Sequence, residues 1–168
     1  QMMIKDGAKT MPGKIFFQDG KMRQEFQDEE GQTITIVRPD RHVIWVVLPQ
    51  ERTYVEMPLK GRLPGQFIQM PPDAVSKHLV RTETVNGYET ERFEVTVKGG
   101  EGLEKETVWQ AKKLGVPIKV VQEGRDFCVE YRCIKEGGVT ERLFEPPPGF
   151  KKATQTTGFS RKVKEEVE

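Results

Sequence analysis

Few side chains in this chain of 168 residues are able to act as a general base, a nucleophile or a metal ligand. The main candidates are two histidines and two cysteines. His42 precedes an apolar run and His78 ends an irregular segment, and neither stands beside a second group that would activate it. Cys128 and Cys133 are an odd number of residues apart in the apparent strand DFCVEYRCI, which places them on opposite faces, where they cannot form a disulfide bond.

The sequence also lacks the familiar arrangements of catalytic and metal-binding residues. No glycine-rich phosphate loop, nucleophile elbow, zinc-ligand spacing or calcium loop occurs. The stretch VKGGEG is rich in glycine, but it has no lysine–serine ending and opens no helix, so it indicates a turn. We therefore predict that the protein is not an enzyme, has no catalytic residue and binds no metal or cofactor.

The charge of the chain gives no reason to expect nucleic acid or an anionic membrane as a partner. There are 27 basic and 26 acidic side chains, for a net charge of +1, and the two signs are interspersed in stretches such as GYETERFEVTVKGG. Such a mixture does not form the basic patch that attracts these partners. No run of about 18 apolar residues exists, so no transmembrane segment is predicted.

The elements that must position any site are strands. Apolar and polar residues alternate along most of the chain, and turn signals separate the alternating stretches. Met22 and Phe26 share one face of KMRQEFQ, and Ile34 and Ile36 share one face of QTITIVR. Asn86–Gly87 is typical of a tight hairpin turn. The short links favour an antiparallel meander of about eleven strands in a mainly β fold, and a meander of this length must curl or close.

Residues 58–79 break the alternating pattern. Four prolines and two glycines lie between Pro58 and Pro72, among large apolar residues. Prolines resist strand interiors, and a long irregular connection is often a lid or a binding loop. We predict a lid-like connection with a short helix in PPDAVSKHL. It lies within a single domain of residues 1–152, which is followed by a C-terminal tail of residues 153–168.

The run Val43–Leu48 is apolar at every position. Because a strand with one face in water alternates, this strand must be covered on both faces. We expect the face of Trp45 to look into a concavity and the other face to be covered by PGQFIQM or by the C-terminal PPPGF. The stretch VTERLFE, just before PPPGF, is predicted to form a strand.

Apolar surface on the sheet is what remains for function. It belongs either to an ordinary filled core or, in part, to a cavity for an acyl chain or another apolar ligand, since barrels of sufficient size leave such a cavity. The residues that we expect to line the cavity are Met22, Phe26, Ile34, Ile36, Trp45, Val47, Met57, Phe67, Phe93, Trp109 and Phe127.

Four motifs in order resemble a known family. GKIFFQDGKMRQEF, QTITIVRPDRHVIWVVLPQERTYVEM, GYETERFEV and FEPPPGFKK together resemble the LolA/LolB-like superfamily of bacterial periplasmic and outer-membrane lipoprotein-binding proteins, closest to an uncharacterised exported branch. The resemblance covers residues 11–152. It implies a curled antiparallel half-barrel with a short helix or lid. It also implies an exported protein of the periplasm or outer membrane of a Gram-negative-type bacterium, with a signal sequence outside this chain.

Two functions remain open. The first is non-enzymatic binding of a lipid, an acyl chain or a lipoprotein in the concave apolar face, as a carrier or receptor of the cell envelope. The second is an envelope sensor or protein–protein interaction module with a filled core and no lipid ligand. The second function requires an exposed apolar patch for its protein partner.

Overall fold

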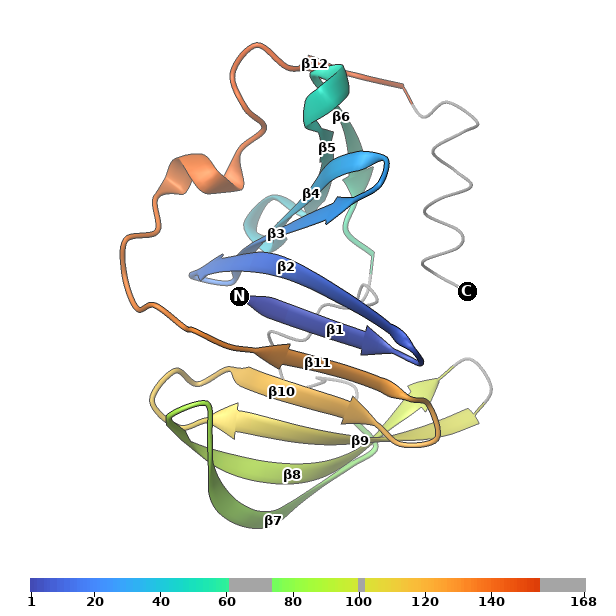
Figure 1. Cartoon of the computed structure of the whole chain (residues 1–168), viewed down its shortest axis with the longest axis vertical. Helices are drawn as coiled ribbons and strands as arrows, with labels where there is room; N and C mark the ends of the chain where they lie inside the picture. The colour runs from blue at the N-terminus through green and yellow to red at the C-terminus, as the bar shows by residue number, and fades with distance from the viewer. Residues whose placement is uncertain (61–73, 100–101, 155–168) are drawn as a thin grey trace. The chain divides into compact units, whose positions relative to one another are not determined.

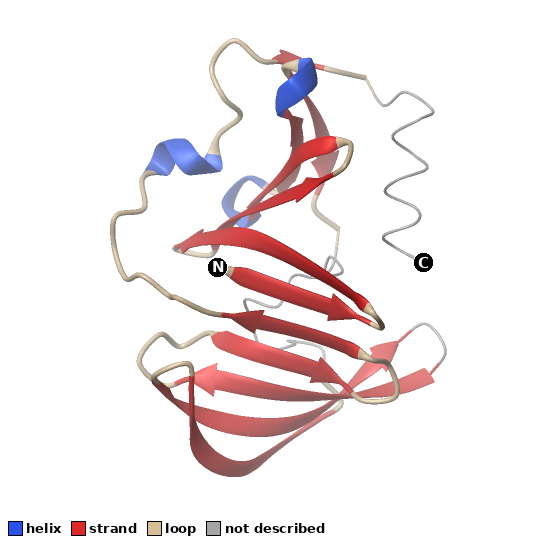
Figure 2. Ribbon diagram, in the orientation of Figure 1, coloured by secondary structure: helices blue, strands red, loops and turns tan. Residues whose placement is uncertain are grey.

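The computed structural model describes residues 1–60, 74–99 and 102–154 (Figure 1). Strands dominate these residues, and three short 3₁₀ helices lie between or after them (Figure 2). The strands are β1 (Met2–Asp6), β2 (Lys9–Gln18), β3 (Lys21–Asp28), β4 (Gly31–Arg38), β5 (Val43–Leu48), β6 (Thr53–Pro58), β7 (Ser76–Val85), β8 (Tyr88–Gly99), β9 (Gly102–Ala111), β10 (Pro117–Gln122), β11 (Phe127–Tyr131) and β12 (Lys151–Lys152). The 3₁₀ helices are η1 (Pro39–Arg41), η2 (Pro49–Glu51) and η3 (Glu141–Phe144).

Hydrogen bonds join the twelve strands of the described residues into one sheet. The strand order is β12-β6-β5-β4-β3-β2-β1-β11-β10-β9-β8-β7, so most neighbours in sequence are also neighbours in the sheet. The hairpin pairs are antiparallel, whereas the two-residue β12 runs parallel to β6. The order ends at β12 and β7, which leaves the sheet open. This confirms the predicted mainly β fold built on an antiparallel meander.

The chain folds into two compact units. Unit 1 comprises Gln1–Pro12 and Gly65–Lys135, and unit 2 comprises Gly13–Pro64 and Glu136–Glu168. Each unit is therefore assembled from two separate parts of the sequence. The single domain expected over residues 1–152, with its lid-like connection, stays a prediction.

Unit 1 has one apolar row across its central strands. Phe93 lies opposite Val108, Val108 opposite Val120, and Val120 opposite Val129. Directly opposed residues of an antiparallel pair point to the same face. None of the four is more than 8% exposed. This row therefore marks the core face of unit 1.

The predicted hairpin at Asn86–Gly87 is confirmed. The φ angles of Asn86 and Gly87 are 49° and 83°, in the left-handed region that a type I′ turn requires at both positions. The side-chain amide of Asn86 also donates to Glu130 Oε1 and to the carbonyl of Tyr131, both at 2.9 Å. The turn between β7 and β8 is thereby tied to β11.

In unit 2, the C-terminal segment packs onto one face of β4 and β5. Ile36 lies opposite Trp45, so their side chains share this face. Phe144 of η3 packs against them and is fully buried. We call this face the sealed face and residues 139–150 the strap. The buried cluster comprises Ile34, Ile36, Trp45, Val47 and Phe144, and Val139, Leu143 and Phe150 of the strap pack against it.

Two arginines of the sheet bind the backbone of the strap. Arg23 Nη1 donates to the carbonyl of Leu143, and Arg38 Nη1 donates to the carbonyl of Phe144, each at 3.0 Å. Carbonyls at the end of a helical turn lack partners within the helix. The two guanidinium groups supply these partners at the point where Phe144 enters the core.

Two local predictions are wrong. The stretch VTERLFE forms a loop and η3 instead of a strand, since a single turn buries Phe144 while Glu141 and Arg142 stay exposed. The short helix expected in PPDAVSKHL does not include Ser76–Leu79, which pair with β8 as the first part of β7. Residues 71–73 of that stretch lie outside the described residues.

The strap also corrects the expected covering of β5. Phe150, from the motif PPPGF, packs against the cluster that contains Trp45. The C-terminal motif therefore covers the face of Trp45 and not the opposite face. The alternative cover, PGQFIQM, lies outside the described residues.

We predict that Phe144→Ala destabilises the protein by about 3–5 kcal/mol, because it removes a fully buried aromatic side chain and leaves a cavity over Trp45. Urea unfolding followed by tryptophan fluorescence measures this change. The matched control is Leu103→Ala, at a side chain that is 66% exposed, which should change stability by less than about 0.5 kcal/mol. Equal shifts for the two variants would contradict the sealing role of Phe144.

Candidate functional site

The second face of unit 2 is formed by β3 to β6. Met22 lies opposite Val37, Val37 opposite Ile44, and Ile44 opposite Met57, which makes one continuous apolar row. Met22, Val37 and Ile44 are at most 2% exposed, and Met57 is half-buried. The next row consists of Gln24, Thr35, Val46 and Val55.

The charges of these strands are sorted onto the other face. All lysines, arginines and glutamates of β3 to β6 share the face of Trp45. The sealed face thus supplies ionic groups to the strap, while the opposite face offers only apolar, hydroxyl and amide groups. We call the latter the uncharged face; it comprises Met22, Gln24, Phe26, Thr33, Thr35, Val37, Ile44, Val46, Leu48, Thr53, Val55 and Met57. The charged residues of the sealed face are Lys21, Arg23, Glu25, Arg38 and Glu56.

The residues predicted to line one cavity are distributed over several surfaces. Met22, Phe26 and Met57 belong to the uncharged face; Ile34, Ile36, Trp45 and Val47 belong to the sealed face; Phe93 and Phe127 share the core face of unit 1; Trp109 lies on the other face of unit 1; and Phe67 is outside the described residues. The structure therefore keeps the first three together and separates them from the cluster of Trp45.

Sequence reasoning missed Ile44, Val46 and Val55, which are central to the uncharged face. A signal for them was present in the turns. Each hairpin between β2 and β6 has an even number of loop residues, so a residue at an even position pairs with one at an odd position. Applied at each turn, this rule places Ile44 and Val46 on the face of Met22 and excludes Trp45 from it.

The polar edge of the sealed face is fully occupied by ion pairs. Trp45 Nε1 donates to Glu56 Oε2 at 2.9 Å, and Lys152 Nζ donates to Glu56 Oε1 at 2.8 Å. The bond from Lys152, followed by that from Trp45, lowers the pKa of Glu56 below its ordinary value. A carboxylate held in this way is a poor general base at neutral pH. The group therefore stabilises the sheet edge and is unsuited to acid–base chemistry.

A second ionic group surrounds Arg38. Its guanidinium donates to both carboxylate oxygens of Asp40 and to Glu145 Oε1, at 2.8 to 2.9 Å. The bond from Arg38 lowers the pKa of Asp40 to about 2. Arg38 is 4% exposed, and a buried charge persists only when it is paired and hydrogen-bonded. This arrangement therefore anchors the strap to β4.

Trp109 of unit 1 lies in charged surroundings. The guanidinium of Arg92 is 5.3 Å and the ammonium of Lys119 is 5.0 Å from the ring centroid of the indole. Trp109 Nε1 donates to Glu83 Oε1, and this bond is the main cause of the lowered pKa of Glu83. Pairing places Trp109 opposite Arg92, so it cannot share the face of Phe93. The indole is thus part of a polar face.

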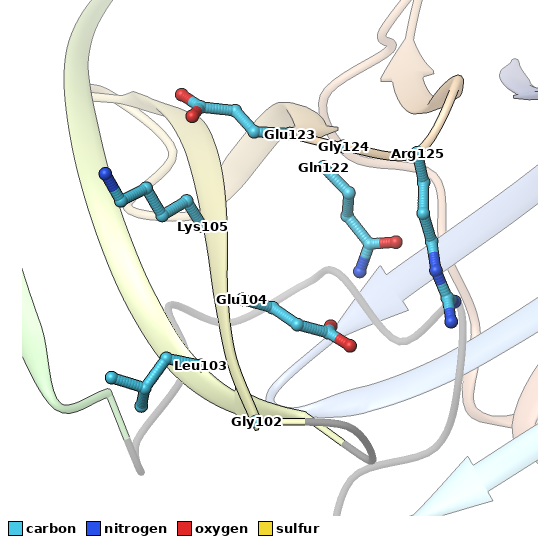
Figure 3. Close-up of a pocket in the computed structure, with 8 residues that line it drawn as sticks. All are labelled: Gly102, Leu103, Glu104, Lys105, Gln122, Glu123, Gly124 and Arg125. Atoms are coloured by element: carbon cyan, nitrogen blue, oxygen red, sulfur yellow. The ribbon is translucent and has the colours of Figure 1, made fainter.

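A pocket of about 490 Å³ lies in unit 1 beside the start of β9 and the link from β10 to β11 (Figure 3). In Figure 3 the side chains of Glu104, Gln122 and Arg125 point into a common space, whereas Lys105 and Glu123 point away from it. Gln122 Nε2 also donates to Oε1 of the buried Glu106 at 3.0 Å. Because the converging groups are an acid, an amide and a base, this pocket suits polar ligands and differs from the expected apolar cavity.

The remaining reactive groups form no recognisable centre. Within residues 1–60, 74–99 and 102–154, no three histidine, cysteine, aspartate or glutamate side chains gather as metal ligands would. Cys128 and Cys133 are free thiols, and burial raises the pKa of Cys128, which disfavours the reactive thiolate. None of the helices in the described part of the chain has the length and apolarity to cross a membrane.

Comparison with known proteins identifies one family and two similar structures. A family model described as "Domain of unknown function (DUF4412)" matches residues 1–116. No curated protein matches the sequence. The crystal structure of the Mycobacterium tuberculosis lipoprotein LppX is similar with a TM-score of 0.45 and 12% identity, over 76% of this chain and 80% of that chain. A DUF1329 family protein from Desulfovibrio piger has a TM-score of 0.37 and 15% identity, over 86% of each chain.

We predict that Asp40→Asn flattens the acid side of the stability profile. The folded-state pKa of Asp40 is lowered, so its contribution is present above the ordinary carboxyl pKa and is lost as the pH falls towards about 2. Urea midpoints measured at several values between pH 5 and pH 2 should therefore fall less steeply for the variant than for the wild type. Identical slopes would show that the bond from Arg38 does not contribute to stability.

Proposed function

The chain belongs to the family described as domain of unknown function DUF4412, and we propose that it is a non-enzymatic binding protein of the bacterial cell envelope. Its ligand is a lipid, an acyl chain or the acyl part of a lipoprotein, held against the uncharged face of unit 2. In this role the protein serves as a carrier or a receptor. The envelope location, in the periplasm or at the outer membrane, is supported by the motifs that resemble the LolA/LolB-like superfamily.

One observation carries the proposal: the sheet of unit 2 is apolar on both faces, and its charged residues are confined to the face that the strap seals. A face that only had to contact water would carry charges, since those are the residues most often exposed. The row Met22, Val37, Ile44 and Met57 carries none. Burial of an acyl chain satisfies such a surface at no cost in unpaired polar groups.

The size of the expected interaction is adequate. Each methylene removed from water contributes about 0.8 kcal/mol, so ten would contribute roughly 8 kcal/mol before the cost of association is subtracted. The four strands from β3 to β6 span roughly 14 Å between the outer two, which is wide enough for an extended chain to lie across or along them. Binding of useful strength therefore requires no ionic contact.

The composition of the face also suits an adaptable site. Met22 and Met57 have flexible, polarisable side chains that adjust to ligands of different shape. Phe26 and Met57 are half-buried and Phe17, of the same face, is 36% exposed, so they form a rim through which an apolar chain has access. The buried members of the row then form the floor of the site.

The alternative is an interaction module with a filled core and no lipid. The observation in its favour is exposed apolar surface outside the uncharged face: Val75, Leu79 and Val80 are 54%, 48% and 42% exposed. The absence of any co-purified lipid in native mass spectrometry, with no binding of a fatty-acid probe, would favour this alternative over lipid binding.

We predict that Met57→Gln weakens binding of a fluorescent fatty-acid probe by about tenfold. The exchange places an amide on the uncharged face and removes apolar contact worth about 1–2 kcal/mol. Titration of the probe, monitored by its fluorescence, gives the affinity. Because Met57 is half-buried, the fold should tolerate the change, which circular dichroism verifies.

The matched control is Tyr54→Gln. Tyr54 is also half-buried and also lies on β6, but its side chain belongs to the sealed face, where it packs against the cluster of Trp45. Its replacement should leave the affinity for the probe unchanged. Equal losses of affinity in the two variants, or none in either, would exclude the uncharged face as the binding site.

A further inference from the structure

We propose that the free edge of β7 pairs with the same edge of a second copy of this chain, antiparallel and centred on Thr82. The pairing joins the two sheets in a symmetric dimer. The proposal concerns unit 1 alone and is independent of lipid binding.

The edge is available and partly apolar. β7 ends the strand order, and among the described residues it is hydrogen-bonded to β8 on one side only. An unpaired strand edge presents backbone donors and acceptors that another strand can use. Leu79 and Val80, which are 48% and 42% exposed, add large apolar side chains beside this edge. Pairing would withdraw both kinds of group from water.

Symmetry restricts the register of such a pair. A two-fold axis perpendicular to the joined sheet leaves each face on its own side, so residues can oppose each other only if both are odd-numbered or both are even-numbered. Three adjacent registers fit the regular part of β7. They are centred on Arg81, on Thr82 or on Glu83.

Charge selects one of these registers. Centring on Arg81 sets two arginines against each other, and centring on Glu83 sets two glutamates against each other. Centring on Thr82 places each Arg81 opposite the Glu83 of the other copy, which gives two attractive pairs. Opposite charges directly across a strand pair stabilise it and like charges destabilise it. The strand is therefore complementary to itself in a single register.

The carboxylate of this pair is already held in position. Glu83 Oε1 accepts the hydrogen bond of Trp109 Nε1, and Glu83 Oε2 lies 3.0 Å from Arg81 Nη2 of its own strand. The side chain of Arg81 is 59% exposed and that of Glu83 is 28% exposed. A second guanidinium can therefore approach Glu83 from the open edge without prior reorganisation of the carboxylate.

The bulge in β7 lies outside this central register. Between Leu79 and Arg81 the pairing with β8 shifts by one residue. Bulges often protect a sheet edge against pairing, but the stretch from Arg81 to Val85 is regular. At the bulge, Leu79 and Val80 come close to Thr84 and Val85 of the second copy, where their exposed apolar surface is covered.

Disulfide trapping tests the register directly. In a background with Cys128→Ser and Cys133→Ser, Thr82→Cys sets two cysteines directly opposite each other, with Cα atoms roughly 4.5–5.5 Å apart, a spacing that a disulfide accepts. Mild oxidation should yield a covalent dimer on a non-reducing gel. Thr84→Cys, at an equally exposed position of the same strand, is the control, because its two copies lie about 13 Å apart along the strands and should not cross-link.

A charge exchange tests the ion pairs. Arg81→Glu and Glu83→Lys should each be monomeric in sedimentation equilibrium at concentrations where the wild type dimerises, because each sets like charges opposite each other. An equimolar mixture of the two variants should dimerise again, because every opposed pair is then of opposite sign. Circular dichroism of each variant confirms folding.

A wild type that stays monomeric at 100 µM or above overturns the proposal. So does equal cross-linking of Thr82→Cys and Thr84→Cys, or a mixture that fails to dimerise although both variants are folded. A dimer that forms unchanged in Arg81→Glu would place the contact on another surface and would equally refute pairing through β7.

Discussion

The burial of Phe144 against Ile36 and Trp45 is the contact on which unit 2 depends. It requires Arg38, whose buried guanidinium binds Asp40, Glu145 and the carbonyl of Phe144. A buried charge of this kind is tolerated only because its donors are satisfied on several sides. The consequence is a division of labour: one face of the sheet is closed by the chain itself, with all the nearby charges, and the other is left without charges.

The sequence predicted the strands of this fold better than it predicted which residues share a face. The alternation in KMRQEFQ and QTITIVR and the turn at Asn86–Gly87 were sufficient to place hairpins, and the apolar run of β5 correctly required two covers. The phase was lost at the turns: Met22 was grouped with Ile36 although pairing sets Arg23 opposite Ile36. The strap lay beyond such reasoning, since its position depends on tertiary contacts of Arg23 and Arg38 with backbone carbonyls.

The same loss of phase explains the placement of Trp109. Its neighbours in sequence suggested an apolar lining, yet the register of β8 and β9 pairs it with Arg92 and leaves Val108 to meet Phe93. Residue type alone gives no warning, because an indole is equally stable in a core or between two cations. Only the count of residues through each hairpin distinguishes the two faces, and that count identifies the uncharged face as well.

The two ends of the strand order are protected differently, and this bears on which surfaces remain for partners. At β6, the chain adds the two-residue β12, whose Lys151 and Lys152 are exposed, so this edge is capped by backbone pairing and by charge. At β7 no strand of the described residues follows, and the defence consists of one bulge. Selection against edge pairing would be expected to act on both ends alike. The difference is accounted for if the segment after the strap closes the first edge and a second copy of β7 closes the other.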